Sequence, residues 1–211
     1  MPNSMSDRSR TLTALDRIID AGPAAWLQSR GFTRRSRGFH RLSNPLILTL
    51  SFQSAKHNSP GNEVFCVNLG IEWPYWYQTW TGRMPPRNPA TAPTFIGARL
   101  HPAAGWGQDY WWRAAPCPNE AGVAEEIVSV LNKHAELFWT RFGDLAAVLT
   151  QLDAGERPPF VGPEHLIVAA LLTRAGRQSQ AEELLEKELD STPSPELVRI
   201  IAGRLGLILA A

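Results

Sequence analysis

His101 and Asp109 are the best candidates in the chain for catalytic chemistry. They flank a segment rich in glycine and tryptophan, and a hairpin there would bring the two side chains together. An imidazole beside a carboxylate can carry out general acid–base catalysis. No familiar enzyme signature accompanies the pair, since the chain has no Gly-x-x-x-x-Gly-Lys phosphate loop, Gly-x-Ser-x-Gly elbow or His-Glu-x-x-His motif. A small enzyme of unrecognised type stays open as one function class, but we assign no catalytic residue.

The cysteines predict neither a metal site nor a disulfide. Neither Cys66 nor Cys117 has a partner at the spacing of metal ligands or redox pairs, so we expect reduced thiols, no metal and no cofactor. The sequence holds no apolar run of roughly 18 residues, and it begins without the basic-then-apolar order of a secretory signal. These features predict a cytoplasmic protein without a membrane span.

A second group that could do chemistry is a cluster of arginines. The first half of the chain is basic and the second half acidic, and five arginines lie close together in the first half: Arg30, Arg34, Arg35, Arg37 and Arg41. A basic patch with aromatic residues near it can bind single-stranded nucleic acid. The ordinary interpretation of such a cluster is a solvated turn, because no recognisable binding module surrounds it. A nucleic-acid-binding domain is the second function class.

Tryptophans supply the third class. Six of them lie between residues 73 and 112, in a segment rich in proline and glycine. Some should form a hydrophobic cluster, but Trp, Tyr and Arg also dominate the contacts of protein-binding surfaces. We therefore predict a surface that recognises another protein or a small ligand, formed by Trp73, Trp76, Trp80, Arg83, Arg99, Trp106 and Trp111.

The element that must position these side chains is a sheet. Three strand-like runs, residues 38–42, 46–53 and 63–71, follow one another with polar turns between them. In the second run the even-numbered residues 46–52 are apolar, while Thr49, Ser51 and Gln53 alternate with them. Alternation with one polar face indicates a sheet that helices cover on one side only. The predicted fold class is α+β, with an antiparallel meander.

Helices are expected on both sides of these strands in the sequence. Apolar spacing predicts one over residues 9–21, a short one around Trp26, and a long one after Asn119 whose buried stripe includes Ile127, Val130 and Leu137. Residues 72–118 should be a long irregular excursion with strands near 94–101 and 109–114. The predicted α+β domain is residues 1–155, and residues 156–211 form a helical tail with helices near 164–174, 179–188 and 195–205.

Several short motifs together resemble one family. They are Gly31-Phe32 followed by basic residues, Gln53-Ser54-x-Lys56, Phe65-x-Val67-Asn68-Leu69-Gly70, Asp109-x-Trp111-Trp112 and Phe138-Trp139. On these, residues 8 to about 153 resemble the bacterial domain of unknown function 4304 family. The resemblance implies an α+β fold and no established activity. The segment 73–93 and the C-terminus are additions to the short family pattern.

The tail is similar to a single tetratricopeptide unit, in the stretch 171–177, in the stretch 181–186 and at Pro193. One unit cannot bury its own apolar face, so the tail must pack on the main domain or on a partner. We expect it to dock on the main domain through Leu166, Ile167, Leu171, Leu184 and Leu185.

Taken together, these features favour a non-enzymatic protein-interaction module, a monomer or homodimer. Its partner is expected to be another protein, with neither nucleic acid nor membrane involved. One specific version, by analogy with small sheet-and-helix immunity proteins, is neutralisation of a toxin.

Overall fold

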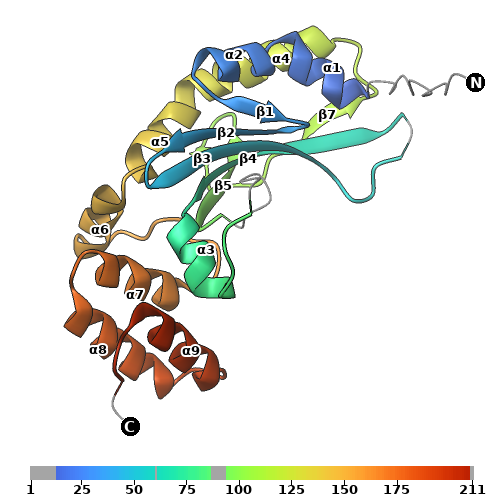
Figure 1. Ribbon diagram of the computed structural model, residues 1–211. Coiled ribbons are helices and arrows are strands. Elements are labelled where there is room, and N and C mark those ends of the chain that lie inside the picture. The colour runs from blue at the N-terminus through green and yellow to red at the C-terminus, as the bar shows by residue number, and fades with distance from the viewer. Residues whose placement is uncertain (1–12, 60, 87–93, 210–211) are drawn as a thin grey trace, which may run out of the picture.

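An antiparallel sheet forms the centre of the molecule (Figure 1). The computed structural model describes residues 13–59, 61–86 and 94–209. Within them the sheet has seven strands in the order β1-β2-β3-β4-β5-β6, while β7 pairs with the other end of β4. Their bounds are Thr33–Arg35 (β1), Gly38–Ser43 (β2), Leu46–Ser54 (β3), Glu63–Glu72 (β4), Ile96–His101 (β5), Gly105–Trp106 (β6) and Trp112–Ala115 (β7).

The predicted meander is confirmed. β2, β3 and β4 are consecutive antiparallel neighbours, with Phe39 opposite Leu50 and Leu50 opposite Leu69. These three side chains are at most 1% exposed and belong to one continuous core. The α+β fold class follows directly from this sheet and the helices packed on it.

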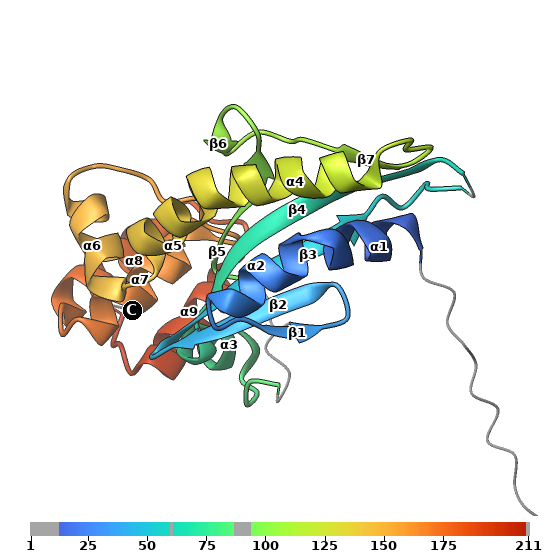
Figure 2. The ribbon, with the colours of Figure 1, turned by 90° about the horizontal axis from the view of Figure 1, so that it is seen from above.

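Four helices lie across one face of the sheet (Figure 2). The covering helices are α1 (Ala14–Ala21), α2 (Pro23–Ser29), α4 (Glu120–Val130) and α5 (Glu136–Phe142). The α1 helix begins at a capping box formed by Thr13 and Asp16, and the predicted start of this helix at residue 9 lies outside the described residues. Asn119 caps α4 as predicted, because its side chain accepts the amide of Gly122.

The predicted buried stripe of this helix is wrong at one residue. Ile127 and Val130 lie in the core, but Leu137 is 59% exposed. Between α4 and α5 the helix makes a π-helical turn, Leu131–Ala135. A π turn contains more residues than an α turn, so it rotates the stripe that follows. Phe138 and Phe142 consequently occupy the core positions in α5, and Leu137 points away.

The proline- and tryptophan-rich segment is more regular than predicted. Instead of an irregular excursion from residue 72, the chain forms helix α3 (Pro74–Thr81) directly after β4. Pro74 suits the first helical position, and Gly82 ends the helix in the left-handed conformation at φ 70°. The two predicted strands are present as β5 and β7, and a third short strand, β6, pairs with β5.

The C-terminal tail packs against the main domain through α3. After α6 (Leu145–Asp153), it consists of α7 (Glu164–Arg174), α8 (Gln178–Leu189) and α9 (Pro195–Leu205), which lie together below the sheet in Figure 1. Arg204 of α9 donates to the carbonyl oxygens of Thr79 and Trp80 at the end of α3. Leu166, Ile167, Leu171 and Leu185 are buried, and Leu184 is half-buried.

In the part of the chain described, no helix combines the length and hydrophobicity needed to cross a membrane.

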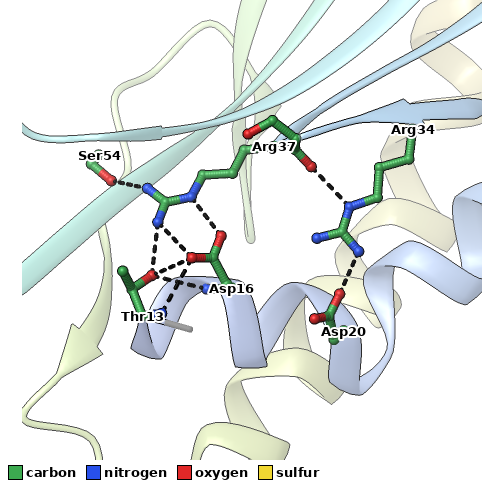
Figure 3. Close-up of polar contacts among 7 residues, drawn as sticks. Thr13, Asp16, Asp20, Arg34, Arg37 and Ser54 are labelled. Atoms are coloured by element: carbon green, nitrogen blue, oxygen red, sulfur yellow. Dashed lines mark hydrogen bonds and ion pairs between the residues drawn. The ribbon is translucent and has the colours of Figure 1, made fainter. Parts of the chain in front are cut away.

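Two arginines attach α1 to the β1–β2 hairpin (Figure 3). Arg37 donates to both carboxylate oxygens of Asp16, at 2.8 and 3.0 Å, and also to Thr13 and Ser54. Arg34 pairs with Asp20 one turn further along α1. The hydrogen bonds from Arg37 hold the pKa of Asp16 well below its usual range. This helix therefore needs a charged Asp16 for its full attachment to the sheet.

Replacing Asp16 tests this attachment. We expect Asp16→Asn to lower the free energy of unfolding at pH 7 by about 2–3 kcal/mol, because a charge-assisted pair and a helix cap are both lost. The folded-state pKa is depressed, so the wild-type advantage should be complete above about pH 4 and shrink as the pH falls further. Urea denaturation of both proteins between pH 3 and 7 measures this difference.

The matched control is Asp20→Asn, since Asp20 is 43% exposed in its pair with Arg34. Exposed pairs contribute less than about 1 kcal/mol. Equal losses for the two variants would contradict a special role for Arg37 and Asp16.

Candidate functional site

The face of the sheet opposite the helices is polar. Alternation places Thr49 and Ser51 of β3, Asn68 of β4 and Arg99 of β5 on this uncovered face. Ser51 is opposite Asn68, and Asn68 is opposite Arg99, so these three side chains form one row across the strands. Asn68 donates to the side-chain oxygen of Gln53 at 2.9 Å, which fixes its amide within the row.

The uncovered face contains a cavity of about 570 Å³. Two glycines at paired positions, Gly70 and Gly97, form its floor. A Cβ on Gly70 would lie 2.4 Å from Cγ2 of Thr94 and 2.5 Å from Oγ1 of Thr49, so both threonines approach the strand closely because it carries no side chain there. Such an approach requires glycine.

One wall of the cavity comes from the segment that leads to the tail. Residues 159–161 run beside β5, where Gly97 donates to the carbonyl of Pro159 at 3.0 Å and Val161 donates to the carbonyl of Phe95 at 2.9 Å. Val161 reaches the cavity and would meet a Cβ on Gly97 at 3.2 Å. The linker between the two predicted domains is thus part of the site.

Glu72 is the chemically unusual member of the cavity. It lies at the end of β4, is 3% exposed, and has an Oε2 atom without a hydrogen-bond partner among the described residues. Burial raises the pKa of Glu72 to about 8. The carboxyl is therefore mostly neutral at pH 7, and an ionisable group perturbed in this way inside a cavity is a candidate functional group.

A positive group marks the opposite end of the face. Arg99 pairs with Asp109 and lies over the ring of Trp111, with its guanidinium carbon 5.0 Å from the ring centroid. Arg99 is opposite Asn68, four residues before Glu72 on β4, which corresponds to about 13 Å along the strand. Trp111 is 39% exposed and forms an aromatic rim beside Arg99. The face therefore carries a buried carboxyl group at one end and an arginine with an aromatic ring at the other.

The predicted tryptophan surface is wrong for two of its members. Trp73 and Trp76 are 2% and 3% exposed and lie in the core, where Trp73 packs against Phe95 at a centroid distance of 5.6 Å. Trp80 and Trp106 are half-buried. Formation of α3 explains this result, because a helix at the end of β4 turns its aromatic side chains toward the sheet and the tail.

The remaining predicted residues fall at different places. Arg99 and Trp111 lie together at the basic end of the uncovered face. Arg83 is exposed just after α3, and it is not among the residues that line the cavity. The structure thus joins two of the seven predicted binding residues in one site.

The proposed acid–base pair does not converge. Nδ1 of His101 accepts hydrogen bonds from the backbone amides of Ala103 and Ala104, at 3.1 and 2.9 Å. Asp109 is held by Arg99 instead. No hydrogen bond or ion pair between His101 and Asp109 occurs in the described structure. Nor do the described residues contain a cluster of three His, Cys, Asp or Glu side chains that could hold a metal ion.

The arginine cluster is largely engaged within the chain. Besides Arg34 and Arg37, Arg30 lies 3.8 Å above the ring of Trp26, and Arg41 donates to the carbonyl of Arg30. These contacts hold the hairpin and the helices together. They leave the guanidinium groups less available for phosphates than a solvated turn would.

Comparison with known proteins assigns the chain to a family. A family model described as "Domain of unknown function (DUF4304)" matches residues 24–141. The chain belongs to the DUF4304 family. The match contains all seven strands of the sheet together with Glu72, Arg99 and Trp111, whereas Val161 and the tail lie outside it. No curated protein and no solved structure matches the chain.

Glu72 is not among the site residues that we predicted from the sequence. The signal that could have found the site is the alternation of residues 65–72, because it places Glu72 on the same face as Asn68, away from the apolar side chains.

The pH dependence of stability tests the state of Glu72. Because its folded-state pKa is raised, folding takes up a proton between about pH 4.5 and pH 8, and stability is lost as the pH rises through this range. The loss should approach about 1.4 kcal/mol per pH unit. We expect Glu72→Gln to lack this slope and to be more stable than the wild type by on the order of 3 kcal/mol at pH 7. Urea denaturation at pH 5, 6, 7 and 8 measures both proteins. Parallel pH profiles would contradict a buried neutral Glu72.

The close approach at Gly70 predicts a second result. Gly70→Ala should lower the free energy of unfolding by about 1–3 kcal/mol, because its new methyl group overlaps Thr49 and Thr94. The control is Gly203→Ala in α9, where an added Cβ meets nothing within 4 Å. That change should be neutral or stabilising by up to about 1 kcal/mol. Thermal or urea unfolding compares the two, and an unaffected Gly70→Ala protein would mean that the cavity floor is looser than described.

Proposed function

We propose that this protein is a non-enzymatic interaction module that binds another protein on the uncovered face of its sheet. The observation that carries this proposal is the polar face itself, with its cavity at Glu72 and its exposed rim of Arg99 and Trp111. An exposed face with a concave centre and a Trp–Arg rim has the composition of a protein-binding surface.

Catalysis and nucleic-acid binding receive less support from the geometry. His101 and Asp109 have separate partners, and three arginines of the hairpin, Arg34, Arg37 and Arg41, are engaged with α1, with the end of α2 and with α5. We therefore place the function on the uncovered face and not at either of those two positions.

The more specific version of the proposal is neutralisation of a toxin partner in the cytoplasm. It rests on analogy with small sheet-and-helix immunity proteins, and fold alone does not determine function. The α7–α8 pair, which we propose to be a tetratricopeptide-like unit, would then support the site from its own chain through the 159–161 segment, in a monomer or homodimer.

Cross-linked capture of a partner tests the proposal. The tagged full-length protein is cross-linked in the cells that encode it, in parallel with Asn68→Arg, which places a long charged side chain in the middle of the uncovered face. The matched control is Ser179→Arg, which adds the same side chain at an exposed position of α8. We expect one protein to be captured by the wild type and by Ser179→Arg but lost with Asn68→Arg. Capture that is equal for all three proteins would contradict binding at this face.

Trp111→Ala then measures how much the rim contributes to the affinity for the partner. With the captured partner, its affinity should fall by about 2 kcal/mol or more while the unfolding curve stays close to that of the wild type. If expression of the partner alone stops growth and co-expression of this protein restores it, the toxin-neutralising version is supported. A partner without any such effect would exclude that version.

A further inference from the structure

We propose that the Glu72 end of the cavity receives a cationic side chain, a lysine ammonium or an arginine guanidinium, from the bound protein. This inference rests on the proposed function and names the chemistry by which the uncovered face recognises its partner.

The carboxyl of Glu72 is buried without a partner in the described part of the chain. Oε2 of Glu72 has no hydrogen-bond partner among the described residues, although the side chain is 3% exposed and lines an open cavity. A buried polar group without a partner destabilises a fold, and a leucine or glutamine would fill this position at lower cost. A ligand that supplies the missing partner removes that penalty when it binds.

Hydroxyl groups line the same cavity as the carboxyl. Oγ1 of Thr49 lies over Gly70 and Oγ1 of Thr94 lies over Gly97, so both add acceptor oxygens to the cavity that Glu72 lines. A carboxylate together with hydroxyl oxygens forms a site for a group with several N–H donors, such as an ammonium or a guanidinium.

The charged and titratable groups nearest to this end of the cavity lie on three elements. On β5, Arg99 lies about 13 Å along the strand and is held by Asp109. On β2, His40 lies on the same face. Its pKa is lowered mainly by burial and, to a smaller extent, by the charge of Arg35. On α9, Arg204 is bound to the carbonyls at the end of α3, and α3 itself carries no charged residue. Among the described residues none of these groups is paired with Glu72, so the carboxyl lacks a cation and the partner can supply it.

Size is consistent with such an occupant. The cavity volume of about 570 Å³ falls within the range of about 300–1,000 Å³ typical of ligand sites, and it opens onto the uncovered face. One long side chain from a partner protein could enter it while the partner contacts the rim at Arg99 and Trp111.

Binding of a cation releases a proton. Glu72 holds a proton at neutral pH, and it accepts a cation as a carboxylate, so the O–H bond breaks and the proton passes to solvent. Because burial raises the pKa of Glu72 to about 8, the apparent affinity for a cation should rise by about tenfold per pH unit up to pH 8 and level off above it.

Small probes test this on the full-length protein. The cationic probes are n-butylammonium and ethylguanidinium, and the matched probes are butyrate and butanol. Backbone amide shifts of Gly70, Gly97 and Thr49 are followed by NMR at pH 6, 7 and 8. We expect saturable shifts at these residues with the cations only, and a dissociation constant about tenfold lower at pH 7 than at pH 6.

Two variants serve as controls. Glu72→Gln removes the carboxylate and nearly keeps its shape, so it should lose both the binding and the pH dependence. If that variant does not fold, Thr49→Val serves instead, because it removes one acceptor oxygen. It should lower the affinity for both cations several-fold and leave the pH dependence of that affinity unchanged. Equal cation binding by Glu72→Gln, no saturable shift with either cation, or a preference for butyrate would overturn the proposal. The probes need no partner, so their failure leaves the capture experiment intact, and a failed capture leaves the probe titration intact.

Discussion

Every second residue of β3 and β4 points to the same face of the sheet, so the burial of Leu48, Leu50 and Leu69 under the helices turns Thr49, Asn68 and Glu72 to the other face. This period of two is the constraint on which the rest of the structure depends. It gives the protein one face that the four covering helices close and one that remains open. The site on the open face is a consequence of the same alternation that builds the core.

The other elements stabilise this division. Arg37 and Arg34 hold α1 on the covered side, and Arg204 holds the tail against α3 at the end of the sheet. The segment that joins the tail to the domain then runs beside β5 and places Val161 at the cavity. The tail, which lies outside the DUF4304 match, thereby contributes to a site that lies mostly inside it.

The sequence predicted those features that depend on local periodicity. The three central strands, the cap at Asn119 and the three tail helices follow from alternation, spacing and capping residues, and the structure has them. Burial of Trp73 and the exposure of Leu137 could not be predicted in this way, because neither follows from the local pattern: Trp73 packs against Phe95, and a π turn rotates the helix before Leu137. Glu72 was visible in the sequence as a carboxylate, but its isolation from any partner is a property of three-dimensional packing.

A single titration tests most directly whether the open face contains a buried, neutral carboxyl. In the protein labelled with ¹³C at glutamate side chains, the carboxyl carbon of Glu72 is followed by NMR against pH and assigned by its absence from Glu72→Gln. We expect a midpoint near pH 8, because burial disfavours the charged form. A midpoint at about 4.3, as for an exposed glutamate, would contradict it. Glu72 would then be a solvated side chain, and the cavity would contain no buried, unpaired carboxyl that a cation from the partner could bind.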